Sequence, residues 1–191
     1  MRSKGEYVHS EPTPTLAPEI PKRTHRKGLV TRQMQITVLG SGSWGTALAV
    51  LLGKKCYPVR LYGLPEESSA ILRDGENARY LPGTKLPENV RATSDIDDAL
   101  DATEAVVLAI PSGGVREVSS LVKGKFGEEV LLVHAGKGLE SESGLRGSQV
   151  IEQELGSEIG GRCVVLSGPN PAVELARGIP TATVVASSDS G

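Results

Sequence analysis

Three glycines stand at the spacing Gly-x-Gly-x-x-Gly, at positions 40, 42 and 45. They directly follow an apolar run at 36–39 and lead directly into a stretch of helical composition. In a strand–turn–helix unit, Gly40 would permit the tight turn, Gly42 would let a diphosphate approach the main chain, and Gly45 would allow close helix packing. The helix N-terminus would offer free N–H groups and a positive dipole end to the phosphates. The sequence therefore predicts a dinucleotide-binding loop.

A glycine-rich turn that binds nothing is the alternative, and Trp44 argues against it because a large aromatic side chain on such a loop more naturally packs against a ligand. The acid that usually binds the ribose should follow about 20 residues later, at the end of the second strand. No acid stands immediately there, although Glu66 or Glu67 could reach, and no arginine is obviously placed for a 2′-phosphate. The sequence leaves the choice between NAD and NADP open.

A second candidate is Lys137, which lies between two glycines just after the apolar run 130–133. The glycines would let the backbone approach a ligand, and the ammonium could bind an anion or stabilise charge on a reacting oxygen. A solvated lysine is the alternative. We interpret the neighbouring His134 as a hydrogen-bonded residue at the strand end rather than as a catalyst.

Small and polar residues also follow two other apolar runs. The segment 111–116, Pro-Ser-Gly-Gly-Val-Arg, would let a cofactor pass close to the backbone, or would simply be a tight turn. Farther along, Gly168 exposes backbone and Asn170 carries both a donor and an acceptor. Asn170 could equally be the N-cap of a helix over 172–177, and both roles can hold together.

The elements that would position these residues alternate along the chain. Apolar runs indicate strands at 36–39, 59–62, 90–93, 105–110, 130–133, 163–166 and 181–186. Helices are expected between them, at 44–54, 66–73, 95–100, 115–122, 148–155 and 172–177. The continuous apolar character suits strands covered on both faces. The predicted fold is α/β, a Rossmann-type doubly wound parallel sheet with ligands at the carboxyl ends of its strands.

Composition bounds the function. The 191 residues carry a net charge of −2, which gives no reason to expect nucleic acid or an anionic membrane as partner, and no apolar run approaches the length of a membrane span. Two cysteines are too few for a disulfide framework or a four-ligand metal site, so a reducing cytoplasm fits best.

Residues 1–33 are proline-rich and basic and are expected to be a disordered leader before a domain at 34–191, with Met34 as a candidate natural start.

Several stretches together resemble the bacterial-type NAD(P)-dependent glycerol-3-phosphate dehydrogenases. They occur in order from about residue 34 to residue 191, and no single one is diagnostic: Gly-Ser-Gly-Ser-Trp-Gly-Thr-Ala-Leu-Ala at 40–49, Asn-Ala-Arg-Tyr-Leu-Pro-Gly at 77–83, Leu-Pro-Glu-Asn at 86–89, Ile-Pro-Ser at 110–112, Gly-Lys-Gly-Leu-Glu at 136–140, Ser-Gln-Val-Ile at 148–151, Leu-Ser-Gly-Pro-Asn at 166–170 and Gly-Ile-Pro-Thr-Ala at 178–182.

Members of that family reduce dihydroxyacetone phosphate to sn-glycerol 3-phosphate, which supplies glycerophospholipid synthesis. The resemblance implies that Ser43 and Trp44 contact NAD or NADP beside the glycines, and that Ala172 approaches it. It further implies that Lys137 touches both cofactor and substrate, with Gly168 and Asn170 on the substrate side. Three positions depart from the family: Leu64 replaces a frequent basic residue or histidine, Asn170 a serine or threonine, and Pro171 a phenylalanine or leucine.

The family also has a second, helical domain, which carries a catalytic lysine and the phosphate-binding residues. The resemblance therefore implies that a general-base lysine lies beyond Gly191, that the full-length protein could form a homodimer, and that the present chain is inactive alone. Two other functions remain open. One is a related two-domain dehydrogenase acting on a hydroxy acid, and the other is a dinucleotide-binding module without catalysis.

Overall fold

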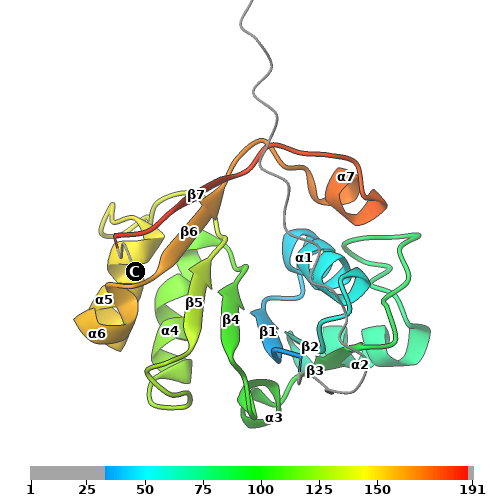
Figure 1. The fold of residues 1–191 in the computed structure, drawn as a ribbon, viewed down its shortest axis with the longest axis horizontal. Helices are drawn as coiled ribbons and strands as arrows, with labels where there is room; N and C mark the ends of the chain where they lie inside the picture. The colour runs from blue at the N-terminus through cyan, green and yellow to red at the C-terminus, as the bar shows by residue number, and fades with distance from the viewer. Residues whose placement is uncertain (1–32, 189–191) are drawn as a thin grey trace, which may run out of the picture. The chain divides into compact units, whose positions relative to one another are not determined.

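The computed structural model describes residues 33–188, which form an α/β unit around one seven-stranded sheet (Figure 1). The strands are β1 (Ile36–Leu39), β2 (Val59–Tyr62), β3 (Val90–Thr93), β4 (Ala105–Leu108), β5 (Leu131–His134), β6 (Val164–Ser167) and β7 (Val184–Ala186). The helices are α1 (Ser43–Lys54), α2 (Pro65–Asp74), α3 (Ile96–Leu100), α4 (Val115–Val122), α5 (Gly147–Leu155), α6 (Ser157–Gly160) and α7 (Ala172–Arg177), with a 3₁₀ turn, η1, at Ser112–Gly114. The leader expected at 1–33 lies outside the described residues except for its last position.

The sheet has the order β3-β2-β1-β4-β5-β6-β7, and every pair from β3 to β6 is parallel. The chain moves outward from β1 in one direction to β2 and β3, then returns to place β4, β5 and β6 on the other side. This reversal between β1 and β4 is the point at which doubly wound sheets bind ligands. The predicted Rossmann-type fold is confirmed.

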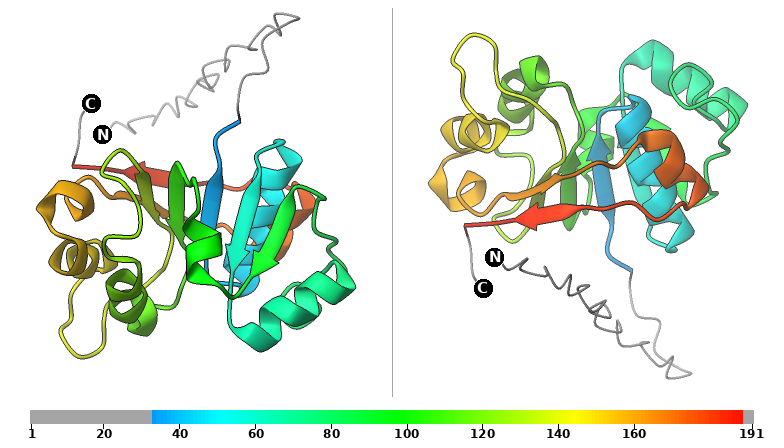
Figure 2. Two further views of the ribbon diagram at one scale, coloured as in Figure 1. Left: turned by 90° about the horizontal axis from the view of Figure 1, so that it is seen from below. Right: turned by 90° about the horizontal axis from the view of Figure 1, so that it is seen from above.

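Helices cover both faces of the sheet, as the two turned views show (Figure 2). On one face, α1 contributes Leu48 and Ala49 to an apolar cluster with β1 and β2. On the other face, the cluster contains residues of α3, α4 and α5 together with β4. The central strands β1 and β4 are buried at all four positions, which confirms the interpretation of their apolar runs as doubly covered strands.

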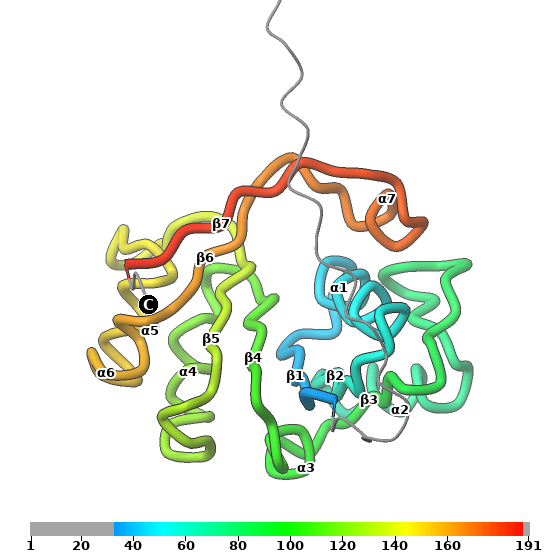
Figure 3. The backbone as a smooth tube through the Cα atoms, in the orientation of Figure 1, coloured from blue at the N-terminus to red at the C-terminus, as the bar shows by residue number. Residues whose placement is uncertain are grey.

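The last strand is the one departure from the predicted parallel sheet among the described strands, because β7 is antiparallel to β6. The chain leaves β6, forms α7 beside α1 and comes back along β6 as β7 (Figure 3). Because β7 begins at the end of the sheet where β6 finishes, with Ser167 opposite Val184, the connection through α7 does not cross back to the other end of the sheet, and β7 pairs antiparallel to β6. The strand is also shorter than expected and uncovered: Val184 and Val185 are 65% and 63% exposed.

Other boundaries differ by one or two residues, and the short helix α6 was not predicted. Cys163 is buried, as expected from the apolar run that it opens, and burial raises the pKa of its thiol to about 11. Among residues 33–188, no helix is long and apolar enough to cross a membrane.

Candidate functional site

A cavity of about 430 Å³ opens at the carboxyl ends of β1, β4, β5 and β6, at the reversal point of the sheet. It is lined by Gly42, Ser43, Trp44, Ala109, Ile110, Pro111, Ala135, Gly136, Lys137, Asn170, Pro171 and Ala172. The structure therefore brings together residues from four separate post-strand segments. Of the predicted segment 111–116, Pro111 lines this cavity.

The phosphate loop, residues 40–45, needs its glycines for different reasons. Gly40 has φ +112°, and a Cβ there would lie 2.6 Å from the carbonyl oxygen of Ala109. A Cβ on Gly45 would overlap the carbonyl oxygen of Gly40, so this glycine lets the first turn of α1 approach the loop. Around Gly42 a Cβ would meet no atom within 4 Å, which leaves the main chain open toward the cavity. The predicted turn and packing roles of Gly40 and Gly45 are confirmed.

Asn77 holds the phosphate loop from behind. Its side-chain amide donates hydrogen bonds to the carbonyl oxygen of Ser41 at 2.6 Å and to the hydroxyl of Thr46 at 2.8 Å. The Thr46 hydroxyl in turn donates to the same carbonyl oxygen, and all three residues are buried. The loop is therefore fixed by a segment that lies more than 30 residues later in the chain.

Glu67, in the first turn of α2, fixes the same loop from the side of β2. Its carboxylate accepts hydrogen bonds from the hydroxyl of Ser41 at 2.5 Å and from the hydroxyl of Tyr80 at 3.0 Å. The hydrogen bond to this carboxylate raises the pKa of the Tyr80 phenol. The sequence suggested Glu66 or Glu67 as a ribose ligand, and the structure shows that Glu67 already braces the phosphate loop, whereas Glu66 is exposed.

Trp44 links the phosphate loop to the segment after β5. Its indole N–H donates to the carbonyl oxygen of Ala135 at 3.0 Å. The ammonium of Lys137 lies over the ring, 5.6 Å from its centroid, a distance that permits a cation–π interaction. Trp44 is half-buried on the wall of the cavity, where the phosphate loop meets the segment after β5.

Lys137 also contacts the segment after β6. Its ammonium donates to the carbonyl oxygen of Gly168 and to the side-chain oxygen of Asn170, each at 3.0 Å. Asn170 is buried and donates from its amide to the hydroxyl of Thr183 at 3.3 Å. The interpretation of Asn170 as a helix cap is wrong, because the N-cap of α7 is Pro171 and the Asn170 side chain is directed to Lys137. Gly168, Asn170 and Lys137 are therefore neighbours, as the resemblance implies.

His134, at the end of β5, lies beneath this segment. It is only 4% exposed, and a Cβ on Gly136 would come within 2.8 Å of the ring, while one on Gly147 would overlap it. Burial lowers the pKa of the imidazole, which favours the neutral form. Our expectation of a hydrogen-bonded histidine is wrong for one atom, since Nδ1 has no partner within the described part of the chain.

The residues on the cavity wall fit a dinucleotide. Helix α1 begins at Ser43 without a side-chain cap and without an acid in its first turn, so no carboxylate competes for its N-terminal N–H groups. The open backbone at Gly42 faces the same cavity, and Lys137 adds a positive charge beside it. An anionic diphosphate would be stabilised by this combination of amides, helix dipole and ammonium.

Two residues that shape the site, Asn77 and Tyr80, were not singled out as functional in the sequence, and Glu67 was considered for the ribose but not for bracing the phosphate loop. Asn77 and Tyr80 belong to the stretch 77–83, which by itself indicates only a loop. Their side chains act on a loop that is distant in sequence, and neither periodicity nor a local motif reports such contacts. Only the resemblance of the stretch to a family marked it as informative.

The fold and this site define a Rossmann-type α/β domain. The family described as the N-terminus of NAD-dependent glycerol-3-phosphate dehydrogenase matches residues 35–191. The chain belongs to this family, as its ordered motifs implied.

Individual relatives agree. The chain is 47% identical over 154 residues to the glycerol-3-phosphate dehydrogenase [NAD(P)+] of Syntrophomonas wolfei, an alignment that covers 80% of the chain and 45% of the relative. It is 44% identical over 155 residues to the enzyme of Moorella thermoacetica, with coverages of 81% and 45%. The crystal structure of glycerol-3-phosphate dehydrogenase from Coxiella burnetii superposes with a TM-score of 0.76 at 33% identity, over 83% of the chain and 48% of that structure. The chain thus spans about half the length of these relatives.

Proposed function

We propose that residues 34–191 bind NAD(P)H and form the cofactor domain of a glycerol-3-phosphate dehydrogenase. The observation that carries this proposal is the shared cavity, in which the open backbone of Gly42, the start of α1 and the ammonium of Lys137 meet. Family membership favours this function over a related hydroxy-acid dehydrogenase. The reaction proposed for the whole protein is reduction of dihydroxyacetone phosphate to sn-glycerol 3-phosphate.

The proposal assigns the cofactor contacts to the phosphate loop and its neighbours: Gly40, Gly42, Ser43, Trp44, Gly45, Lys137 and Ala172. Main-chain amides of the loop and of α1 would hold the diphosphate. The nicotinamide cofactor supplies the hydride when it is bound. The protein residues orient the two reactants and keep the charge of Lys137 at the place where negative charge develops.

Lys137 is proposed to act on the substrate together with Gly168 and Asn170. Both hydrogen bonds of its ammonium go to neutral oxygens, so its positive charge is available to a substrate oxygen. It would stabilise the oxyanion during reduction of the carbonyl. We assign the proton transfer to that oxygen to a lysine outside this chain, in the remaining length that the relatives possess. The free thiols of Cys56 and Cys163 fit a protein that works in the cytoplasm.

The test is titration of the 191-residue chain with NADH and with NADPH. Trp44 is the single tryptophan, so its emission reports the site without interference from other indoles. We expect saturable quenching with energy transfer to the bound nicotinamide, and the two titrations measure the cofactor preference directly. Unquenched emission at millimolar cofactor would contradict the proposal. Turnover is then assayed with dihydroxyacetone phosphate on a protein of the relatives' full length, and binding without turnover there would indicate a non-catalytic module.

A further inference from the structure

The lysine segment, residues 135–140, is held at both of its ends. Ala135 is fully buried, donates its N–H to Leu108 at 2.8 Å and accepts from the indole of Trp44. Glu140 is only 9% exposed, whereas the residues 137–139 between them are exposed. A short exposed stretch between two buried anchors has its course set by those anchors.

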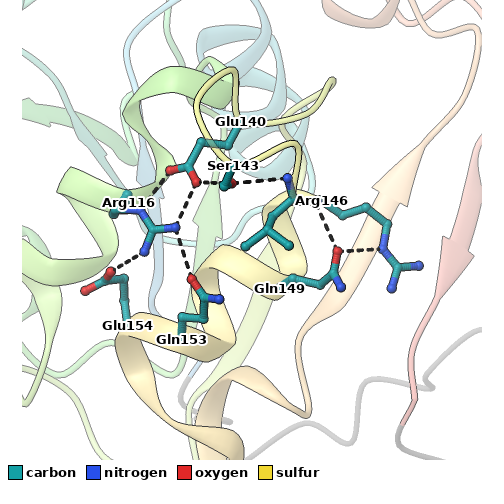
Figure 4. A network of polar contacts seen from close by, with 8 residues as sticks. Arg116, Glu140, Ser143, Arg146, Gln149, Gln153 and Glu154 are labelled. Atoms are coloured by element: carbon teal, nitrogen blue, oxygen red, sulfur yellow. Dashed lines mark hydrogen bonds and ion pairs between the residues drawn. The ribbon is translucent and has the colours of Figure 1, made fainter.

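The second anchor is an ion pair between the segment and α4 (Figure 4). The guanidinium of Arg116 donates from Nε to Glu140 Oε1 and from one terminal nitrogen to Oε2, both at 2.8 Å. The same guanidinium reaches α5, where it binds Glu154 at 2.7 Å and Gln153 at 3.1 Å. Because a bidentate pair fixes orientation as well as distance, Arg116 ties the end of the segment to two helices at once.

A turn after Glu140 completes this anchor. The hydroxyl of Ser143 donates to Glu140 Oε2 at 2.5 Å, and the main-chain N–H of Glu140 donates to Leu145 at 2.9 Å. Figure 4 shows Ser143 and Arg116 converging on the same carboxylate. Both oxygens of Glu140 are therefore engaged in holding the segment.

Glu140 is not suited to proton transfer. The hydrogen bonds from Arg116 and then from Ser143 lower the pKa of its carboxyl group to about 2. The group stays ionised at neutral pH, and its basicity is too low for a general base, whose pKa should lie near the working pH. Its part in the site must therefore be structural or must act through another residue.

We propose that the Arg116–Glu140 pair is a positioning device that sets the placement of Lys137 over Trp44 and beside Asn170. This inference rests on the proposed function of Lys137. The ammonium makes three contacts at once, with the ring of Trp44, Gly168 and Asn170, and such an arrangement requires a defined origin for the side chain. Gly138, at φ +98°, bends the chain immediately after Lys137, so the direction of the bend depends on where Glu140 is held.

A double-mutant cycle on the 191-residue chain tests the proposal with Glu140→Gln, Lys137→Met and the two combined. The Gln side chain keeps the size of Glu140 and loses the charge. Arg116→Lys breaks the same pair from the other side, since lysine cannot form two parallel hydrogen bonds to the Glu140 carboxylate. The control is Asp74→Asn, which removes a carboxylate from another bidentate arginine pair, Arg73–Asp74, on the exposed end of α2. Thermal melts verify that each variant is folded.

Two readouts are followed, Trp44 emission without cofactor and the Kd for NADH. Lys137→Met is expected to change the Trp44 emission, and Glu140→Gln is expected to change it in the same direction. The emission of the double variant should equal that of Lys137→Met alone. Glu140→Gln should weaken NADH binding at least about threefold in the wild-type background and less than about twofold in the Lys137→Met background, because coupled residues are not additive. Asp74→Asn should change neither readout.

Additive effects in both readouts, or a Glu140→Gln variant that behaves like Asp74→Asn, would overturn the positioning role. If Glu140→Gln does not fold, Arg116→Lys takes its place in the same cycle. If the wild-type chain shows no NADH binding, the proposed function fails, and the emission cycle alone still decides whether Glu140 positions Lys137. A purely structural role of Glu140 would lower the melting temperature without coupling to Lys137.

Discussion

The two halves of the candidate site are built differently. In the loop half, residues 40–45, the main chain is fixed at the buried Ser41, which is 3% exposed, by Asn77, also 3% exposed, and by Thr46, which is 0% exposed. In the lysine half, which consists of Lys137, Gly168 and Asn170, the key side chain is exposed and the adjacent strands β6 and β7 are partly or fully uncovered. The loop half is therefore shaped by backbone packing, whereas the lysine half depends on charge and on anchors such as Glu140.

The comparison predicts that the loop half is intolerant of added atoms. Gly45→Ala places a methyl group on the carbonyl oxygen of Gly40, next to the first turn of α1. Because Gly45 is buried and the added methyl group would meet main-chain atoms rather than a flexible side chain, we expect the free energy of unfolding to fall by about 3 kcal/mol or more. Urea denaturation measures this free energy of unfolding. Gly127→Ala is the matched control, since a Cβ there meets no atom within 4 Å, and it should change stability by less than about 0.5 kcal/mol. Equal stability of the two variants would show that the loop is not closely packed.

A smaller effect is expected from Asn77→Ala, which removes the amide behind the loop. The carbonyl oxygen of Ser41 and the hydroxyl of Thr46 each lose a hydrogen-bond donor in a buried environment. Such a loss destabilises a protein by about 1–3 kcal/mol. The same urea experiment measures it, with Asn89→Ala as control because the Asn89 amide also donates to two carbonyl oxygens, those of Gly53 and Tyr57, away from the cavity. A variant with unchanged stability but weaker cofactor binding would instead mean that Asn77 acts on the ligand directly.

The smallest effect is expected from protonation of His134, beneath the lysine half. Burial lowers the pKa of this imidazole in the folded chain below the unfolded value of about 6.5. The unfolded state therefore takes up the proton first, so the contribution to stability is complete above about pH 6.5 and is lost as the pH falls below it. The urea midpoint should drop between pH 7.5 and pH 5.5, and His134→Gln should reduce that drop. An equal drop in the variant would assign the pH dependence to other groups.

The sequence predicted the fold well where the apolar pattern was strong. The strands at 36–39, 59–62 and 90–93 and the helices at 115–122 and 172–177 have the observed boundaries, because each contributes apolar residues to the buried interior, from all four positions of β1 to Ala176 alone in α7. The prediction was wrong for β7, since apolar composition alone does not distinguish a buried parallel strand from an uncovered antiparallel one. Strand direction depends on how the chain returns after α7, and that path is a tertiary property.

The sequence predicted the residues that line the candidate site, but it did not predict the residues that hold them in place. Gly42, Trp44, Lys137 and Asn170 follow strand ends, so the parallel sheet brings them together at one cavity. The supports come from distant or side-by-side elements: Asn77 reaches across more than 30 residues to Ser41, and Arg116 crosses from α4 to Glu140. Such contacts depend on the final packing of helices and loops, which no local spacing in the sequence encodes.

The most direct measurement for the whole account is the NADH affinity of Gly42→Ala. A methyl group at position 42 meets no protein atom within 4 Å, and the backbone there is extended with φ −66°, so stability should fall by less than about 1 kcal/mol. The same methyl group would occupy the space through which the diphosphate reaches the main chain. The account predicts at least tenfold weaker NADH binding in Gly42→Ala and unchanged binding in Gly127→Ala. Wild-type affinity in Gly42→Ala would contradict the claim that the cofactor's phosphates lie against this loop.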